Sequence, residues 1–267
     1  MGGPETVSMK YNIDCRTDGG IVLRQKEDRM PGYVMHLVES QLILDRMKNR
    51  KGTDWEKAFL LGSLLPDTRL KSEKAISHFW NEKYLEDIAK APDLELFLKK
   101  YKSRLDEPLI LGYYLHLYLD VCYVKDYWPA KLSFENAAGE PEKKKAAITD
   151  VVICDRGKKV PLSEFFTRKY YYGDYTRSNG WFIRHYQIRT PEYVAIRDIH
   201  MDEVELEDVK GLLEELTWLC RMAEEHAGSN DPLQVFDISS LDAFLHDTAE
   251  KFWKENSRLL EPENIKA

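Results

Sequence analysis

The chain lacks features that mark several large classes of protein. Its four cysteines are scattered with no Cys-x-x-Cys pair, which indicates free thiols in a reducing compartment. No apolar run reaches the length of a membrane span, and the first residues contain no apolar stretch typical of a secretory signal. We therefore expect a cytoplasmic protein with no transmembrane segment.

Motifs for phosphate loops and for nucleophilic serines are also missing. The sequence contains no glycine-rich phosphate loop and no Gly-x-Ser-x-Gly turn. Basic residues are not in excess, because the formal net charge is −7 and the isoelectric point is about 5.6. This balance argues against broad binding to nucleic acids or to anionic membranes.

The chain does have enough apolar material for a large helical core. It has 267 residues, of which 43% are hydrophobic, and it includes 6 Trp, 15 Tyr and 10 Phe. Helical periodicity dominates, so the sequence predicts one all-α domain with a small β-ribbon accessory element. The expected helices cover 33–48, 53–65 (opened by a capping box at Thr53–Glu56), a segment from about 82, 92–105, 108–127, 191–197, 204–226 and 239–258.

Four parts follow one another within this single domain, 1–267. Residues 1–30 are expected to form an N-terminal arm, in which the sequence at 9–28 predicts a short β-ribbon. Residues 31–130 are expected to form the helical core. Residues 148–190 hold a second ribbon (151–162) and an aromatic segment, and 191–267 hold the C-terminal helices. The polar sequence at 70–77 predicts a loop, and the polar sequence at 129–147 predicts a loop or an exposed helix.

His116 and Asp120 are the most informative residues of the chain. They lie four residues apart in the apolar run 109–121, so in a helix they share one face. A helix that is apolar nearly all round is buried, and a buried carboxylate costs several kcal/mol unless it is paired. A metal ion would satisfy both side chains, and this ligand pair suits Zn²⁺ and its neighbours.

Three further polar residues stand in apolar segments earlier in the chain. His36 follows Pro31-Gly-Tyr-Val-Met35, and His78 precedes Phe79-Trp80. Asp67 directly follows the proline that ends an apolar segment. Each residue taken alone has an ordinary structural explanation, as a hydrogen-bonded core histidine or as part of a turn. Three imidazoles and two carboxylates together make a costly core unless a cation lies among them.

This ordered series resembles the zinc-dependent phospholipase C family, which is related to the P1-type nucleases. The resemblance rests on Pro31–His36, on Phe59-Leu-Leu-Gly-Ser-Leu-Leu-Pro-Asp67, on Lys74–Phe79 and on Leu111-Gly-Tyr-Tyr-Leu-His-Leu-Tyr-Leu-Asp120. The stretch 172–179 is similar to one in uncharacterised bacterial members. The resemblance implies an all-α fold of that type around a buried metal cluster.

The resemblance also implies roles for the individual residues. Asp67, His78, His116 and Asp120 would bind a first ion, and Asp120 would bridge to a second ion that His36 also binds. Zn²⁺ is the expected metal, with Mn²⁺, Fe²⁺ or Ni²⁺ as alternatives. The implied reaction is hydrolysis of a small phosphoester by activated water, with Asp67 orienting the water or acting as general base.

Several features of the family pattern are absent from this sequence. Secreted members use a mature N-terminal amine as a ligand, whereas 35 residues precede His36 here. The full three-metal site of the family needs a histidine soon after Asp120 and then a His-xxx-Asp/Glu pair, but no histidine follows until His185. Thr68 stands where choline-binding members have an aromatic residue. We therefore expect one or two ions.

Other candidate residues lie later in the chain. His246 and Glu250 form a second His-xxx-acid pair that could bind an additional ion, although an ordinary amphipathic helix explains them as well. Tyr175 and Arg177 could contact a substrate. The simpler alternatives are core packing for Tyr175 and a solvated basic surface for Arg177.

The sequence therefore predicts a metal-dependent hydrolase, most directly of a phosphoester. Two alternatives remain open. The first is a non-catalytic metal-stabilised protein that binds a ligand or partner, and the second is an HD-type phosphohydrolase centred on His246 and Asp247.

Overall fold

The computed structural model describes residues 32–47, 52–68, 74–191, 201–204, 206–225 and 232–260. The expected ribbon at 9–28 and nearly all of the expected helix at 191–197 lie outside these residues. The helices are α1 (Tyr33–Arg46), α2 (Thr53–Gly62), α3 (Lys74–Ser77), α4 (Leu94–Tyr101), α5 (Pro108–Cys122), α6 (Trp128–Lys131), α7 (Leu162–Phe165), α8 (Tyr171–His185), α9 (Leu206–Glu225) and α10 (Ile238–Leu260). The strands are β1 (Leu132–Asn136), β2 (Ile148–Ile153) and β3 (Lys158–Pro161).

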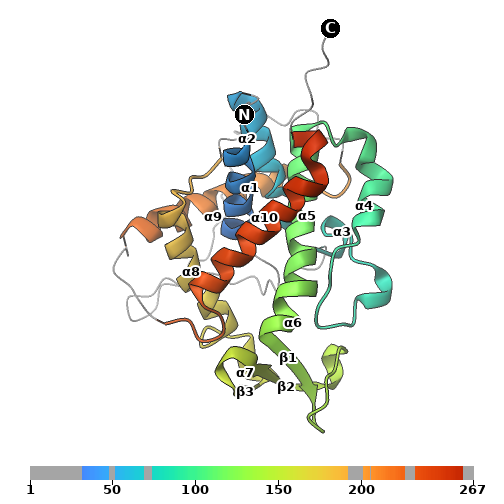
Figure 1. The fold of residues 1–267 in the computed structure, drawn as a ribbon, viewed down its shortest axis with the longest axis vertical. Coiled ribbons are helices and arrows are strands. Elements are labelled where there is room, and N and C mark those ends of the chain that lie inside the picture. The colour runs from blue at the N-terminus through green and yellow to red at the C-terminus, as the bar shows by residue number, and fades with distance from the viewer. Residues whose placement is uncertain are drawn as a thin grey trace, which may run out of the picture.

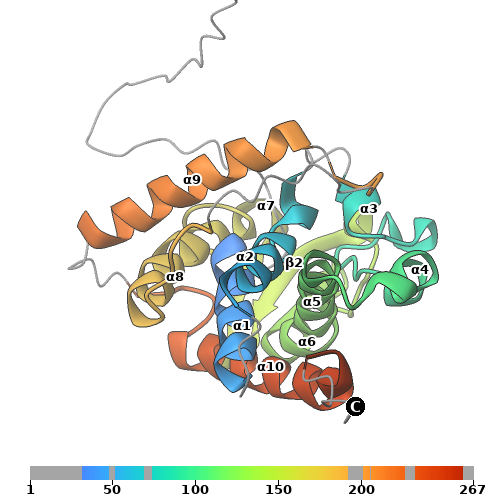
Figure 2. The same ribbon diagram turned by 90° about the horizontal axis from the view of Figure 1, so that it is seen from above.

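The described residues are mostly helical, with one small antiparallel sheet in the order β1-β2-β3. The predicted class, all-α with a small β element, is thereby confirmed. Seen from above, α1, α2 and α5 occupy the middle of the molecule, with α8, α9, α10 and α4 around them (Figure 2). The sheet lies at one end of the molecule, below α6 (Figure 1). No helix among the described residues is both long and apolar enough to cross a membrane.

Helix α5 is the central helix, as the sequence predicted. Pro108 occupies its first turn, where its missing N–H is no loss. Every residue from Ile110 to Asp120 is buried, so the helix has no solvated face along the site. A π-helical turn, Tyr123–Tyr127, then leads into α6.

Helix α2 begins and ends differently from the prediction. The capping box at Thr53–Glu56 is wrong, because Gly52 is the N-cap and its carbonyl accepts the Glu56 N–H at 3.2 Å. Gly52 has φ +94°, a backbone region that favours glycine. The helix ends at Gly62 instead of Leu65, and a 3-10 turn, Leu65–Thr68, carries the chain into the site.

Two glycines let α2 and α5 approach closely. A Cβ added at Gly112 would lie 2.1 Å from the Phe59 carbonyl oxygen, and one at Gly62 would lie 2.1 Å from the Leu109 carbonyl oxygen. No side chain fits at either position without moving the backbone. This contact brings Ser63, just after α2, up to His116 on α5.

The sheet corrects one prediction and confirms another. Strands β2 and β3 form the predicted second ribbon, joined by a turn that ends at Gly157 with φ +56°. The segment 129–147 was expected to be a loop or an exposed helix, but it contains β1, which pairs with β2. The strand forms because Leu132 is buried and Phe134 packs on Trp128, with ring centroids 5.6 Å apart.

Two other local predictions are wrong. A one-turn helix, α3, replaces part of the expected loop at 70–77, and only a 3-10 turn, Glu82–Tyr84, stands where a helix was expected from about 82. The aromatic segment expected in 163–189 is mostly helix α8. Its buried Asp174 accepts the backbone N–H groups of 234–236 at 2.6–3.0 Å, which ties α8 to the chain before α10.

Candidate metal centre

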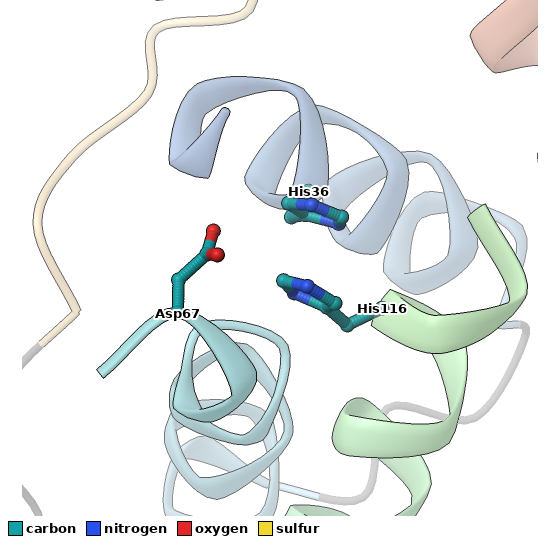
Figure 3. Close-up of side chains that lie close together, drawn as sticks. All are labelled: His36, Asp67 and His116. Atoms are coloured by element: carbon teal, nitrogen blue, oxygen red, sulfur yellow. The ribbon is translucent and has the colours of Figure 1, made fainter. Parts of the chain in front are cut away.

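The structure brings the five predicted ligands together from four segments. His36 lies on α1, Asp67 lies in the 3-10 turn after α2, and His78 directly follows α3. His116 and Asp120 lie one turn apart on α5. All five are buried, with at most 3% of their surface exposed. Figure 3 shows three of them, His36, Asp67 and His116, pointing toward one another from their separate elements.

Three donor atoms form a nearly equilateral triangle. His78 Nε2 and His116 Nε2 are 3.4 Å apart, and each is 3.5 Å from Asp120 Oδ2. These separations are too long for good hydrogen bonds. Two ligand atoms of a tetrahedral ion lie about 1.6 times the metal–ligand distance apart, so the edges of this triangle match a Zn²⁺ ion about 2.1 Å from each donor and out of their plane. The three donors therefore fit one four-coordinate ion.

A fourth donor lies beside this triangle. Asp67 Oδ1 is 3.5 Å from His78 Nε2, the same separation as along the edges of the triangle. Asp67 also falls within a second group of close donor atoms, with His36 and His116. Tetrahedral sites with mixed imidazole and carboxylate ligands are typical of zinc.

The protein holds two of the imidazoles in the orientation that a ligand needs. His116 Nδ1 lies 2.7 Å from the Ser63 carbonyl oxygen, which can only accept a proton. The proton of neutral His116 is therefore on Nδ1, and Nε2 presents its lone pair to the centre. His78 Nδ1 contacts the Ser77 hydroxyl at 3.1 Å. Burial also lowers the pKa of His116 to about 4 and that of His36 to about 3, which keeps both rings neutral.

Asp120 is the residue with the clearest need for a cation. Both of its carboxylate oxygens are buried, and neither accepts a hydrogen bond from any described residue. Burial raises the pKa of Asp120 to about 7, although the neighbouring His36 and His78 oppose the shift. A buried carboxylate without donors is costly, and a metal ion removes that cost.

The second oxygen of Asp120 faces His36. His36 Nε2 lies 3.5 Å from Asp120 Oδ1, whereas the triangle uses Oδ2. The His36 ring also stacks on the His116 ring, with centroids 3.5 Å apart and planes 8° from parallel. The geometry thus offers Asp120 to a second ion, although that ion would have fewer protein ligands among the described residues.

Lys74 is a site residue that the sequence interpretation missed. Its ammonium lies 2.8 Å from Asp67 Oδ1, and both side chains are buried. Burial alone would raise the pKa of Asp67, but the ammonium of Lys74 and the contact with His78 hold it well below its ordinary range. Lys74 stands four residues before His78, so helical spacing from a predicted ligand is the signal that would have found it.

Glu39 is a second missed residue, three positions after His36 on α1. It is fully buried, and neither carboxylate oxygen has a hydrogen-bond partner among the described residues. Burial, and then the charge of Asp120, raise the pKa of Glu39 well above its ordinary range. Glu39 stands three residues after His36 in the sequence, but the pattern predicts only a polar position on an amphipathic helix there.

Glu39→Gln is expected to stabilise the metal-free protein in a pH-dependent way. Because the pKa of Glu39 is raised on folding, its protonated form favours the folded state below about pH 4.5, and this contribution is lost as the pH rises. Glutamine carries no charge at any pH. The free energy of unfolding of the variant, measured with urea in the presence of a chelator, should equal that of the wild type at pH 4.5 and exceed it at pH 8.

The exposed Glu214 on α9 provides the control, since Glu214→Gln should change stability by less than about 0.5 kcal/mol at both pH values. A Glu39→Gln variant that is less stable than the wild type at pH 8 would contradict this description of Glu39.

The turn after His78 is strained and leads toward a cleft that begins at Asn81. Phe79 has φ +52° and is held there by packing on Phe97, with ring centroids 5.3 Å apart. The next residue, Trp80, contacts His78 on one side, with centroids 5.8 Å apart. Asn81, the following residue, helps to line a cleft of about 860 Å³, together with apolar residues of 88–94 and Trp128.

The other predicted site residues lie apart from this group of donors. Tyr175 packs on Gly32, next to the first residue of α1, and its hydroxyl contacts that of Tyr171 at 3.1 Å. Arg177 pairs with Asp174 at 2.7 Å. Their contact with a substrate stays a prediction. His246 and Glu250 are exposed on α10, where His246 Nε2 contacts the Tyr186 hydroxyl at 3.0 Å and Glu250 pairs with Lys254.

Comparison with protein-family models, with curated proteins and with solved structures finds no match to this chain. The description of the centre therefore rests on its own residues and geometry.

Proposed function

We propose that the protein is a metal-dependent hydrolase that acts on a phosphoester, with a phospholipase C-like arrangement of its site. The observation that carries the proposal is the buried triangle of His78, His116 and Asp120 donor atoms, with edges of 3.4–3.5 Å. Its three donor atoms lie close enough together to bind one ion, and its carboxylate has no hydrogen-bond donor among the described residues. These are the properties of a ligand set.

The donor set indicates which residues would hold an ion and what the others do. His78, His116, Asp120 and Asp67 would hold the first ion, and His36 with Asp120 would hold a second. A divalent ion at such a site supplies Lewis-acid activation of water and of a phosphoryl oxygen. Ser63 fixes the ring of His116 through its carbonyl, and the stacked ring of His36 limits its rotation.

Asp67 is the residue best placed to orient an attacking water. Lys74 keeps its carboxylate ionised, so it can accept a hydrogen bond from that water, although the lowered pKa of Asp67 makes it a weak general base. It lies at the end of a tight 3-10 turn, where Thr68 and Asp67 are held by hydrogen bonds to Leu65 and Leu64. Such a fixed position suits the orientation of an attacking water.

Zinc-loaded protein is expected to hydrolyse at least one member of a panel of 4-nitrophenyl esters: a phosphodiester, a phosphomonoester and a phosphocholine ester. Release of 4-nitrophenol, followed by absorbance, should stop on chelation, return on addition of Zn²⁺, and be absent in His116→Ala. Turnover that persists in the chelated protein or in His116→Ala would contradict the proposal.

A second candidate is a metal-stabilised protein with no catalytic role. The burial of all five ligands favours it, because a structural site is closed whereas a catalytic site keeps a position open for water and substrate. Under this reading the protein binds zinc and is stabilised by it, but none of the esters is cleaved. The HD-type alternative receives no support from the exposed His246 on α10.

A further inference from the structure

His78 is the corner of the donor triangle that its own helix cannot position. The other two corners, His116 and Asp120, lie one turn apart on α5, so the geometry of a single helix fixes their separation. His78 instead follows α3, a helix of one turn, which is too short to hold its shape without tertiary contacts. The backbone also changes direction directly after His78, because Phe79 has φ +52°. A contact from outside this turn must therefore set the distance from His78 to the other corners.

Tyr113 makes that contact. It is fully buried and lies three residues before His116 on α5. Its hydroxyl donates a hydrogen bond of 2.5 Å to the Ser77 carbonyl, which belongs to the peptide unit that joins Ser77 to His78. Its ring lies edge-on to the ring of Phe79, with centroids 6.3 Å apart. The helix that carries two corners of the triangle therefore also holds the residues directly before and after the third.

The Ser77 hydroxyl gives this contact a consequence for the imidazole itself. The hydroxyl lies 3.1 Å from His78 Nδ1 and 3.4 Å from the Lys74 carbonyl oxygen. It can accept the Nδ1 proton of His78 while it donates its own proton to the carbonyl, which leaves the Nε2 lone pair for the triangle. Because the hydroxyl and the carbonyl belong to one residue, the bond from Tyr113 to the carbonyl also fixes the hydroxyl beside the ring.

We propose that Tyr113 is a positioning residue of the metal centre. Its hydroxyl, acting through the Ser77 carbonyl, holds His78 at the distance from the other two corners that one ion requires. Outer-shell partners of metal ligands typically contribute about 10- to 100-fold in metal affinity. This inference rests on the metal centre of the proposed function and on no catalytic step there.

The test is a double-mutant cycle on zinc affinity, measured with full-length protein by competition with chromogenic chelators. Tyr113→Phe deletes only the hydroxyl, and it should bind Zn²⁺ at least about tenfold more weakly than the wild type. In a His78→Ala background the same substitution should change the affinity by less than about twofold, because the residue through which the hydroxyl acts is gone. Tyr127→Phe is the matched control, since it also deletes a hydrogen-bonded hydroxyl, 3.1 Å from that of Ser240, and it should leave zinc affinity within about twofold of the wild type.

An unchanged zinc affinity in Tyr113→Phe would overturn the proposal. An equal loss in the wild-type and His78→Ala backgrounds would also overturn it, because the hydroxyl would then act on the structure in general. If Tyr113→Phe does not fold, the wild type decides: the Tyr113 hydroxyl proton should give an NMR resonance that is protected from exchange with water, and exchange as fast as in free tyrosine would refute the proposal. A wild type that binds no zinc refutes the centre and this inference together, whereas zinc binding without ester cleavage refutes the hydrolase alone.

Discussion

His116→Ala is expected to lower the affinity for Zn²⁺ by at least about 100-fold, the larger end of the loss seen when even an outer-shell partner of a metal ligand is removed. The substitution removes one corner of the donor triangle and the stacking partner of His36. Competition with a chromogenic chelator measures the affinity. The zinc-dependent gain in melting temperature should disappear in parallel, because an ion that binds only the folded state stabilises it by mass action.

The exposed His246 on α10 provides the matched control. His246→Ala also deletes an imidazole, but it should leave zinc affinity within about twofold of the wild type. If His246→Ala loses zinc while His116→Ala retains it, the ion is bound by the residues of α10, and the buried cluster is a hydrogen-bonded core.

Gly112→Ala is expected to lower the free energy of unfolding by about 3 kcal/mol, at the upper end of the usual effect of overpacking. The new Cβ would lie 2.1 Å from the Phe59 carbonyl and 2.9 Å from the Ser63 nitrogen, both of them backbone atoms that cannot rotate away. Helix α2 must therefore move away from α5. That movement also withdraws the Ser63 carbonyl from His116, so zinc affinity should fall as well.

Gly211 on α9 separates this contact from the general effect of glycine in a helix. A Cβ at Gly211 meets nothing within 4 Å, so Gly211→Ala should raise the free energy of unfolding by about 0.5–1 kcal/mol through helix propensity alone. Urea unfolding of both variants gives the comparison. Equal effects of the two substitutions would show that the α2–α5 contact is looser than described.

The five residues of the buried cluster could be picked out in the sequence because each stands out against apolar surroundings. His116 and Asp120 interrupt a helix that is buried on every side, and Asp67 follows an apolar helix and a proline. Their joint position in space could not be derived from spacing alone, since it depends on how α1, α2 and α5 pack. The resemblance of the ordered motifs supplied that step as an expectation, and the structure shows His and Asp groups close enough together to hold a metal ion.

Lys74 and Glu39 were missed for a physical reason. Lys74 lies in a polar stretch of sequence and Glu39 on an amphipathic helix, where such residues are ordinarily exposed. Only tertiary packing buries them. Strand β1 was missed because β2 pairs with it across an 11-residue connection, which leaves no short-range hairpin signal. The N-cap of α2 was misplaced by one residue, since Gly52 has no capping side chain to signal it.

Anomalous diffraction at the zinc edge, on crystals of the zinc-loaded protein, tests the central claim most directly. The account predicts a peak about 2.0–2.1 Å from His78 Nε2, His116 Nε2 and Asp120 Oδ2, with Asp67 completing the set. Any second peak should lie between His36 and the other oxygen of Asp120. A zinc peak bound elsewhere on the chain, with none inside the triangle, would contradict the account.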